Sequence, residues 1–131
     1  MAADAPPTTH AALEVTVIGA KSDKGLIRLA ICAPNTGFPD CGKNAVRSGT
    51  MAISKGVATF RFADIPPGTY AIGVFHDANS NGKLDTFMGI PREGYGFSRN
   101  PPFRPRAPRF NEVEVSVHDV SAQSITLRYL M

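Results

Sequence analysis

The chain has 131 residues, which suits one domain with its own hydrophobic core and makes a two-domain enzyme a poor expectation. Hydrophobic residues make up 43% of the chain and charged residues 19%, values that exclude full disorder, a collagen and a long coiled coil. The formal net charge of +3 comes from residues 92–109, which hold five Arg and one Glu, whereas the rest of the chain has nine basic and ten acidic residues. No apolar run is long enough for a membrane span, so we expect a soluble protein that is not membrane-spanning.

The start of the chain and its two cysteines bear on the cellular compartment. We expect residues 1–12 to be a disordered N-terminal segment, followed by a single domain over residues 13–131. We expect no signal peptide in the first residues of this sequence, a start that fits both a mature exported chain and a cytosolic one. Cys32 and Cys41 flank a short loop with two Pro and one Gly, and a bridge there would contribute roughly 2.5–3 kcal/mol. The alternative is two free thiols. A disulfide favours a periplasmic or secreted location.

The pattern of apolar residues predicts β-strands along the whole chain. Apolar residues alternate with polar ones, or form short runs between Gly and Pro turns, as is typical of strands. The expected strands are residues 13–18, 26–31, 50–53, 57–62, 69–76, 112–117 and 124–130. Residues 42–47 are a weak helix candidate, and residues 86–111 are expected to be a long irregular loop. The fold class is therefore all-β, an antiparallel immunoglobulin-like sandwich of about seven strands.

The segment after the fifth expected strand has the spacing of a calcium-binding loop. Oxygen-bearing side chains occupy relative positions 1, 3, 5 and 9, and glycine occupies position 6, where such a loop bends most sharply. Position 7 contributes a backbone carbonyl, so the expected ligands are Asp77, Asn79, Asn81, Lys83 and Asp85. Met88 replaces the usual bidentate Glu at position 12, so the expected affinity is weak, on the order of 10⁻⁴–10⁻³ M. A metal-free turn, in which Asp and Asn side chains accept from backbone amides, is the alternative.

Three segments of the chain resemble one bacterial family. Residues 65–72 (IPPGTYAI), 76–86 (HDANSNGKLDT) and 89–98 (GIPREGYGFS) are similar to motifs of the uncharacterised family DUF2141, and the resemblance extends from about Leu13 to Tyr129. It implies an exported protein but no established activity. The Pro-Pro-Gly-Thr-Tyr segment is also similar to transthyretin-like and carboxypeptidase-regulatory-like sandwiches. After Ser98 the Asn-rich continuation of the family is replaced by an Arg- and Pro-rich one, so the contacts of this loop are expected to differ.

The Arg-rich loop is the candidate binding surface. Tyr95 and Phe97 alternate across a glycine and form either an aromatic platform or a cover for one end of the sandwich. Glu93 either pairs with a neighbouring arginine or completes the calcium sphere. The arginines form either an anion-binding patch or a solvated rim, and they are Arg92, Arg99, Arg104, Arg106 and Arg109.

The function expected from these features is binding. The partner is expected to be an anionic ligand, a lipid, an envelope surface or a small molecule, and not a nucleic acid. We find no catalytic motif, and for His76 the expectation is a hydrogen bond that braces the loop, with His10 and His118 in no recognisable motif. A purely structural or scaffold domain is one alternative. An accessory domain or unrecognised hydrolase is another.

Overall fold

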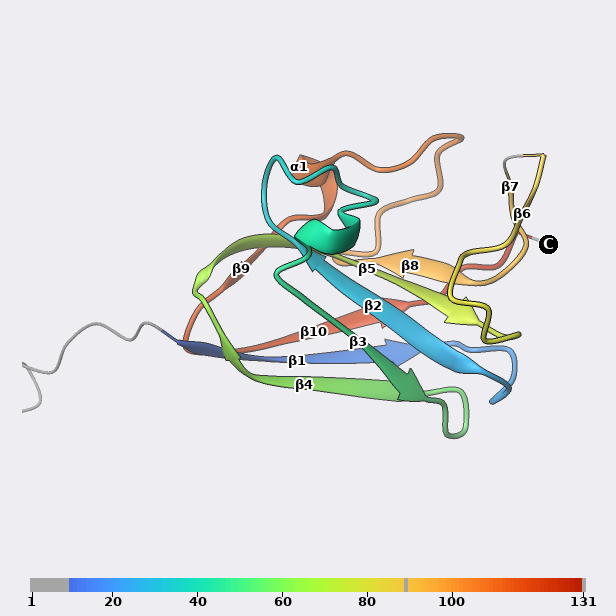
Figure 1. The fold of residues 1–131 in the computed structure, drawn as a ribbon, viewed down its shortest axis with the longest axis horizontal. Coiled ribbons are helices and arrows are strands. Elements are labelled where there is room, and N and C mark those ends of the chain that lie inside the picture. The colour runs from blue at the N-terminus through green and yellow to red at the C-terminus, as the bar shows by residue number, and fades with distance from the viewer. Residues whose placement is uncertain (1–9, 89, 131) are drawn as a thin grey trace, which may run out of the picture.

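The computed structural model describes residues 10–88 and 90–130, and within them ten strands form three sheets (Figure 1). The strands are β1 (Ala11–Ile18), β2 (Leu26–Cys32), β3 (Arg47–Ala52), β4 (Ala58–Ile65), β5 (Gly68–Asp77), β6 (Thr86–Phe87), β7 (Ile90–Pro91), β8 (Tyr95–Phe97), β9 (Val115–Val117) and β10 (Val120–Thr126). A 3₁₀ turn spans Gly42–Asn44 and a short helix, α1, spans Phe110–Val113. In this described part no helix is long and apolar enough to cross a membrane.

The smaller of the two main sheets has β1 at its centre, in the order β10-β1-β4. β1 pairs antiparallel with β4 but parallel with β10, with Val15 opposite both Phe60 and Gln123. The larger sheet has the order β3-β2-β5-β8, and β9 extends it by pairing with the first residues of β5. β6 and β7 form a separate hairpin.

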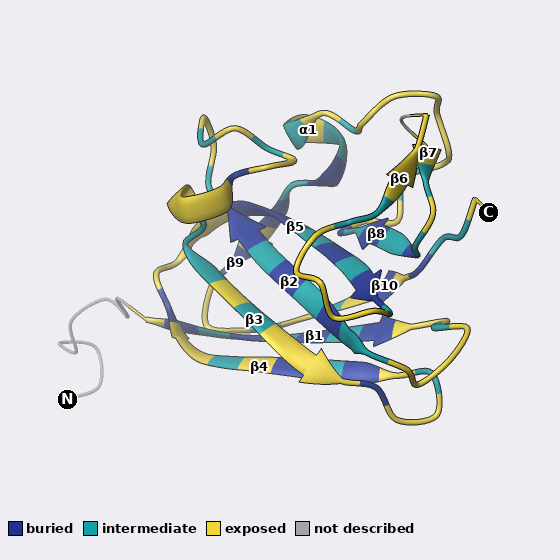
Figure 2. Ribbon diagram, turned by 45° about the vertical axis from the view of Figure 1, so that its right-hand side comes forward, coloured by how far each residue is buried: buried dark blue, intermediate teal, exposed yellow. Residues whose placement is uncertain are grey.

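The hydrophobic core lies between the two main sheets, as the facing ribbons of Figures 1 and 2 show. Along β1 and β2, buried residues alternate with half-buried ones, because successive side chains of a strand point to opposite faces. Val15, Ile27, Ile31, Ile72 and Ile125 contribute fully buried side chains to this core. The outer face of the larger sheet is therefore formed by the alternate, half-buried residues of its strands.

The first five expected strands are confirmed to within a few residues and the last two are displaced, while the expected architecture needs three corrections. The count is ten strands rather than about seven, because β6, β7 and β8 have only two or three residues, too few for a strand pattern to stand out in the sequence. The pairing of β1 with β10 is parallel, so the fold is not wholly antiparallel. The expected irregular loop at 86–111 contains those three short strands and the start of α1.

Smaller differences concern where the first and the last two strands begin and end. The expected strand at 112–117 begins only at Val115, because Glu112 accepts from the Arg109 N–H and stabilises the first turn of α1. The last strand runs from Val120 to Thr126, earlier than expected. β1 begins at Ala11, inside the segment expected to be disordered, whose first nine residues lie outside the described part. The predicted disulfide between Cys32 and Cys41 is present, with the two Cα atoms 5.9 Å apart.

Candidate functional site

The Asp77–Asp85 loop is organised around the carboxylate of Asp77, which is fully buried at the end of β5. Its Oδ2 accepts from Arg28 Nε at 2.6 Å and from the Gly82 N–H at 2.9 Å, and its Oδ1 accepts from the Asn81 N–H at 3.1 Å. Burial by itself raises the pKa of Asp77, but these donors outweigh it and hold that pKa below its ordinary value. The charged carboxylate therefore ties the loop to strand β2.

A second carboxylate, Asp85, lies at the end of the loop and accepts from two amide side chains. Asn81 Nδ2 donates to it at 2.7 Å and Asn79 Nδ2 at 2.6 Å, and these hydrogen bonds lower the pKa of Asp85. The amide oxygens accept from the backbone: Asn79 Oδ1 from the Asn81 N–H and Asn81 Oδ1 from the Lys83 N–H. The structure thus brings four predicted ligand side chains into one network, with the amide oxygens turned toward the backbone.

Glu93 bridges the two ends of this loop from outside it. Its Oε2 accepts from the Ala78 N–H and its Oε1 from the Asp85 N–H, both at 3.0 Å. Over residues 10–88 and 90–130 no three His, Cys, Asp or Glu side chains are grouped to hold a metal ion. A cation at this loop would therefore depend partly on amide and carbonyl oxygens, which are the hard donors that calcium accepts.

His76 is buried near the end of β5, next to Asp77, and has a bracing role. Its Nε2 donates to the Lys24 carbonyl at 2.7 Å, so its Nδ1 accepts from the Tyr129 hydroxyl at 2.8 Å. The same hydroxyl accepts from the Lys21 N–H at 3.0 Å. Burial raises the pKa of Tyr129, so this hydroxyl keeps the proton that it donates. Both ring nitrogens of His76 are engaged in holding neighbouring loops together.

A groove of about 1060 Å³ lies on the outer face of the larger sheet. Its floor is hollow where Ala30 and Gly73 lie opposite each other on β2 and β5, because neither has a large side chain. A Cβ on Gly73 would lie 3.5 Å from the ring of Phe97, its partner on β8. Phe75, which is paired with Tyr95 on β8, forms the aromatic part of the floor.

Loops from four parts of the chain form the walls of this groove. They are the disulfide loop (39–42), the Asp77–Asp85 loop (82–84), β7, and the Pro-rich segment 103–108. Phe97 packs edge to face against both Phe38 and Tyr95, with ring centroids 5.7 and 6.0 Å apart. Tyr95 and Phe97, on the edge strand β8, therefore line the groove and contact each other.

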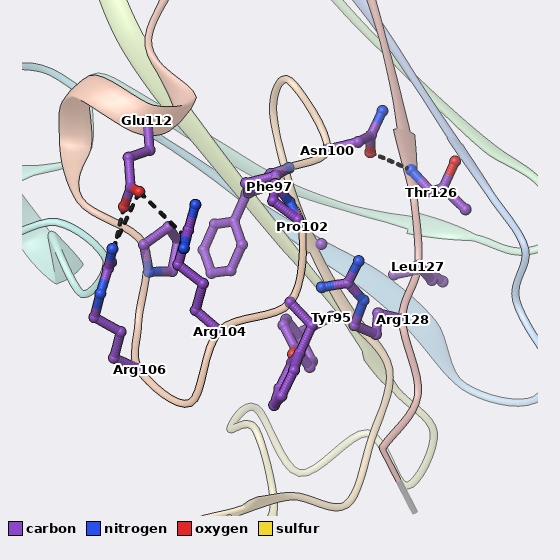
Figure 3. A pocket seen from close by; sticks show the side chains of 14 residues that line it. Tyr95, Phe97, Asn100, Pro102, Arg104, Arg106, Glu112, Thr126, Leu127 and Arg128 are labelled. Atoms are coloured by element: carbon purple, nitrogen blue, oxygen red, sulfur yellow. Dashed lines mark hydrogen bonds and ion pairs between the residues drawn. The ribbon is translucent and has the colours of Figure 1, made fainter.

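The five predicted arginines do not form one patch. The bidentate pair of Arg106 with Glu112 has distances of 2.8 and 3.1 Å, and Arg104 Nε lies 3.7 Å from the same carboxylate (Figure 3). These contacts, with that of Arg106 the largest, lower the pKa of Glu112 to about 2. Of these five, only Arg104 and Arg106 line the groove. Arg99 donates to the Asn111 carbonyl, the Arg109 N–H caps α1, and the Arg92 N–H donates to the Asp85 carbonyl.

Beside the Pro-rich segment lies a smaller pocket of about 240 Å³, which shares Tyr95, Phe97 and Phe103 with the groove. Figure 3 shows Glu112 and its two arginines on one side of this pocket and Arg128 on the other. The guanidinium of Arg128 lies 5.9 Å from the centroid of the Phe103 ring. The Pro-rich segment thus separates two hollows over the same aromatic side chains.

Sequence reasoning missed three groove residues, Arg28, Phe75 and Phe103. The first two carry a usable signal, because each lies between core residues on a strand and must point to the outer face. The position of Phe103 over the sheet depends on contacts distant in sequence, and no local pattern reveals it.

Comparisons with known proteins give one match. Residues 15–126 match the model of a family described as "Uncharacterized protein conserved in bacteria (DUF2141)". No curated protein and no solved structure matches the chain.

Proposed function

Because the chain belongs to the bacterial family DUF2141, whose description assigns no activity, we propose a function from its own residues: it is a binding module whose groove takes a small amphipathic anion. Such a ligand has an apolar body and one carboxylate, sulfonate or phosphate group. The observation that carries the proposal is the aromatic groove on the outer face of the larger sheet.

The apolar body has a matching surface in the groove. Phe75, Tyr95 and Phe97 from the sheet and Phe103 from the Pro-rich segment surround a floor of small residues. Phe103 is 54% exposed, a costly arrangement in water for so large an apolar side chain unless something covers it. The volume of about 1060 Å³ is at the upper end of the range for small-molecule sites, so a flexible ligand of ten or more carbons fits.

Fewer cationic side chains are free to bind the anionic end of the ligand than the five arginines considered from sequence. Arg28 is paired with Asp77 and Arg106 with Glu112, so their charges are largely compensated. Arg104 lies 3.7 Å from Glu112 and its side chain is 54% exposed, so its guanidinium can turn toward a ligand. Lys83 at the opposite wall of the groove is exposed as well. Guanidinium groups bind carboxylate and phosphate in a bidentate manner, which favours an acidic ligand.

A fluorescence titration with anilinonaphthalene sulfonate, an aromatic anion, tests the groove directly. We expect saturable binding that decanoate displaces more strongly than decanol. Ala30→Phe fills the floor and is expected to weaken probe binding at least tenfold, whereas Thr16→Phe on the outer face of the other sheet leaves it unchanged. Arg104→Gln is expected to weaken decanoate binding about fivefold and decanol binding not at all.

Thermal melts of the same variants separate loss of the groove from loss of the fold. If Ala30→Phe remains folded and binds the probe as tightly as the parent, the groove is not the binding site. If the parent shows no saturable binding of either decanoate or the probe, a scaffold role replaces the proposed one.

Calcium binding at the Asp77–Asp85 loop is a second part of the proposal. It is supported by the four oxygen-bearing side chains gathered in one network and by the carboxylate of Glu93 at both ends of the loop. The amides of Asn79 and Asn81 would have to turn their oxygens inward, losing their backbone hydrogen bonds, so we expect a dissociation constant of about 10⁻³ M.

Melting curves in calcium and in chelator test this part. At about 10 mM calcium that affinity stabilises the folded state by roughly 1.4 kcal/mol, which raises the Tm by about 5 °C. Asp85→Ala is expected to abolish the shift, and magnesium at the same concentration to give none. Identical curves in calcium and chelator would remove the metal from the proposal and leave the groove unaffected.

We also propose that the protein works outside the cytoplasm, in the periplasm or after secretion. The disulfide supports this location, because such bonds persist in oxidising compartments. Fractionation of the native bacterium, followed by alkylation of free thiols, tests it. We expect the protein in the periplasmic or secreted fraction with its thiols blocked from alkylation; a cytoplasmic protein with two reactive thiols would contradict the proposal.

A further inference from the structure

Exposed apolar side chains are concentrated at one end of the molecule. Nine large apolar side chains are exposed among the described residues, and five of them lie on the β6–β7 hairpin or at the mouth of the groove beside it. These five are Phe87 (55%), Met88 (86%), Ile90 (45%), Phe103 (54%) and Leu130 (37%). Large exposed apolar surfaces that are rimmed by polar residues mark interaction sites.

The hairpin projects from the body of the protein, and Figure 2 shows its β6 strand as exposed. β6 and β7 pair only with each other, with Phe87 opposite Ile90. Among the described residues, the core between the main sheets contains none from this hairpin, so the side chains of Phe87 and Ile90 do not contribute to it. The apolar tip is therefore not explained by folding.

The charges around this end are arranged asymmetrically. Lys83 and Arg92, at the base of the hairpin, and Arg104, across the mouth of the groove, are exposed. Of the acidic side chains at this end, Asp85 is engaged with two amides and Glu93 with two backbone N–H groups, while Asp40, on the disulfide-loop wall of the groove, is exposed. Glu112 is held by the Arg106 guanidinium. The charge presented outward at the base of the tip is thus positive.

We propose that this end of the protein docks on an anionic lipid bilayer, with the β6–β7 tip inserted at the interface and Lys83, Arg92 and Arg104 against the phosphate groups. Arg92 lies two residues beyond Ile90, which is about 7 Å along an extended strand. That spacing matches the depth of about 5–10 Å to which interfacial segments bury their apolar side chains.

A bilayer fits this surface better than a second copy of the chain does. Two copies meeting through this end would bring two cationic rims together, and each copy already has a net charge of +3. An anionic bilayer supplies both an apolar interior for the tip and negative charge for the rim. Docking here also places the mouth of the groove, which Ile90, Phe103 and Leu130 line, at the lipid surface.

The absence of tryptophan from the sequence makes a clean experiment available. Met88→Trp places a single reporter at the tip. Val120→Trp places one at the first residue of β10, which is equally exposed, at 86%, but lies at the end of the molecule away from the hairpin (Figure 1). With vesicles of phosphatidylglycerol and phosphatidylcholine, we expect a blue shift of emission and at least threefold protection from acrylamide for Met88→Trp only. Pure phosphatidylcholine vesicles are expected to give neither effect.

Vesicle sedimentation of charge and tip variants completes the test. Lys83→Gln and Arg92→Gln are each expected to lower binding to anionic vesicles about fivefold. Phe87→Ser combined with Met88→Ser is expected to lower it at least tenfold while the melting curve stays unchanged, because both side chains are exposed.

Three results would overturn the proposal: no shift for Met88→Trp on anionic vesicles, an equal shift for Val120→Trp, or a shift that appears without vesicles as protein concentration rises. The last result would identify a second copy as the partner. Decanoate binding to the groove is measured without vesicles, so failure of docking and failure of the groove are distinguishable.

Discussion

The most informative single substitution is Asp77→Asn, because it keeps the shape of the side chain and removes the charge that joins the loop to strand β2. The buried carboxylate accepts from three donors, Arg28 Nε and the N–H groups of Asn81 and Gly82. An amide has one acceptor oxygen, so its NH₂ group must face at least one of these donors.

The expected cost follows from those contacts. A hydrogen bond to a charged group contributes about 1.5–3 kcal/mol, and a buried donor left without an acceptor costs about 1–3 kcal/mol. The Arg28 side chain is 32% exposed, so solvent screens part of the ion pair and the lower halves of both ranges apply. We therefore expect the free energy of unfolding to fall by about 3 kcal/mol and the Tm by about 12 °C at pH 7.

The pH dependence of this difference identifies its origin. The pKa of Asp77 is lowered in the folded protein, so its charge stabilises the fold above the unfolded pKa of about 3.9. That contribution is lost as the pH falls from there through the folded pKa. Urea unfolding followed by circular dichroism at pH 7, 5 and 3, in chelator, should show a gap between parent and variant that narrows only below about pH 4.

The exposed Asp40 provides the matched control. Asp40→Asn removes the same charge from an exposed side chain on the rim of the groove, and we expect it to change the free energy of unfolding by less than about 0.5 kcal/mol. A cost below 1 kcal/mol for Asp77→Asn, or a gap that is equal at pH 7 and pH 3, would refute this account of the loop.

Three further substitutions test other contacts. Replacing Cys32 and Cys41 with Ser is expected to lower the free energy of unfolding in urea by about 2.7 kcal/mol, from the loop that the bond closes. Gly96→Ala places a Cβ 2.7 Å from Ile125 Cγ2, and we expect about 1–3 kcal/mol of destabilisation by the same measurement. Glu112→Gln releases two arginine side chains and should tighten decanoate binding severalfold. Because the pKa of Glu112 is lowered to about 2, its ion pairs stabilise the fold fully above about pH 4.5. The Tm of Glu112→Gln should therefore lie below that of the parent at neutral pH, and this difference should disappear as the pH falls through 2.

Each of these has a result that would contradict it. Under reducing conditions the parent is expected to unfold at the same urea concentration as the cysteine variant. A difference between the two would show that the cysteine side chains also contribute by packing. A Gly96 variant as stable as the parent would mean that β8 moves freely. Weaker decanoate binding after Glu112→Gln would show that this carboxylate positions the groove rather than competing for its arginines.

The strands of the main sheets could be predicted from sequence because their signal is local. Val15 and Val17 alternate with polar residues, and turn residues separate each run from the next. The helix at Phe110–Val113 was missed because Val113 and Val115 suggest alternation, whereas the hydrogen bond from the Arg109 N–H to Glu112 fixes a helical turn there. The parallel partner of β1 depends on contacts between distant residues, which no local pattern encodes.

The contacts of the candidate site are likewise of two kinds, those within one segment and those between distant segments. The Asp77–Asp85 network lies within nine residues, and its spacing indicated which side chains would meet. Glu93 reaches the loop from another turn, and its two backbone partners follow only from the fold. Arg104 and Arg106 were predicted to serve a ligand, but their pairing with Glu112 depends on the path of a Pro-rich segment that local pattern does not define.

The central position of β1 has a consequence for how this chain reaches its native state. Val15 pairs with both Phe60 and Gln123, and the second of these becomes available only after β2 to β9 have been synthesised. Until then one edge of β1 is open, and pairing between such distant residues is slow. A chain cut before β10 would keep its β1–β4 pairing but leave the hydrogen-bonding edge of β1 exposed, so truncation products of this protein should be aggregation-prone.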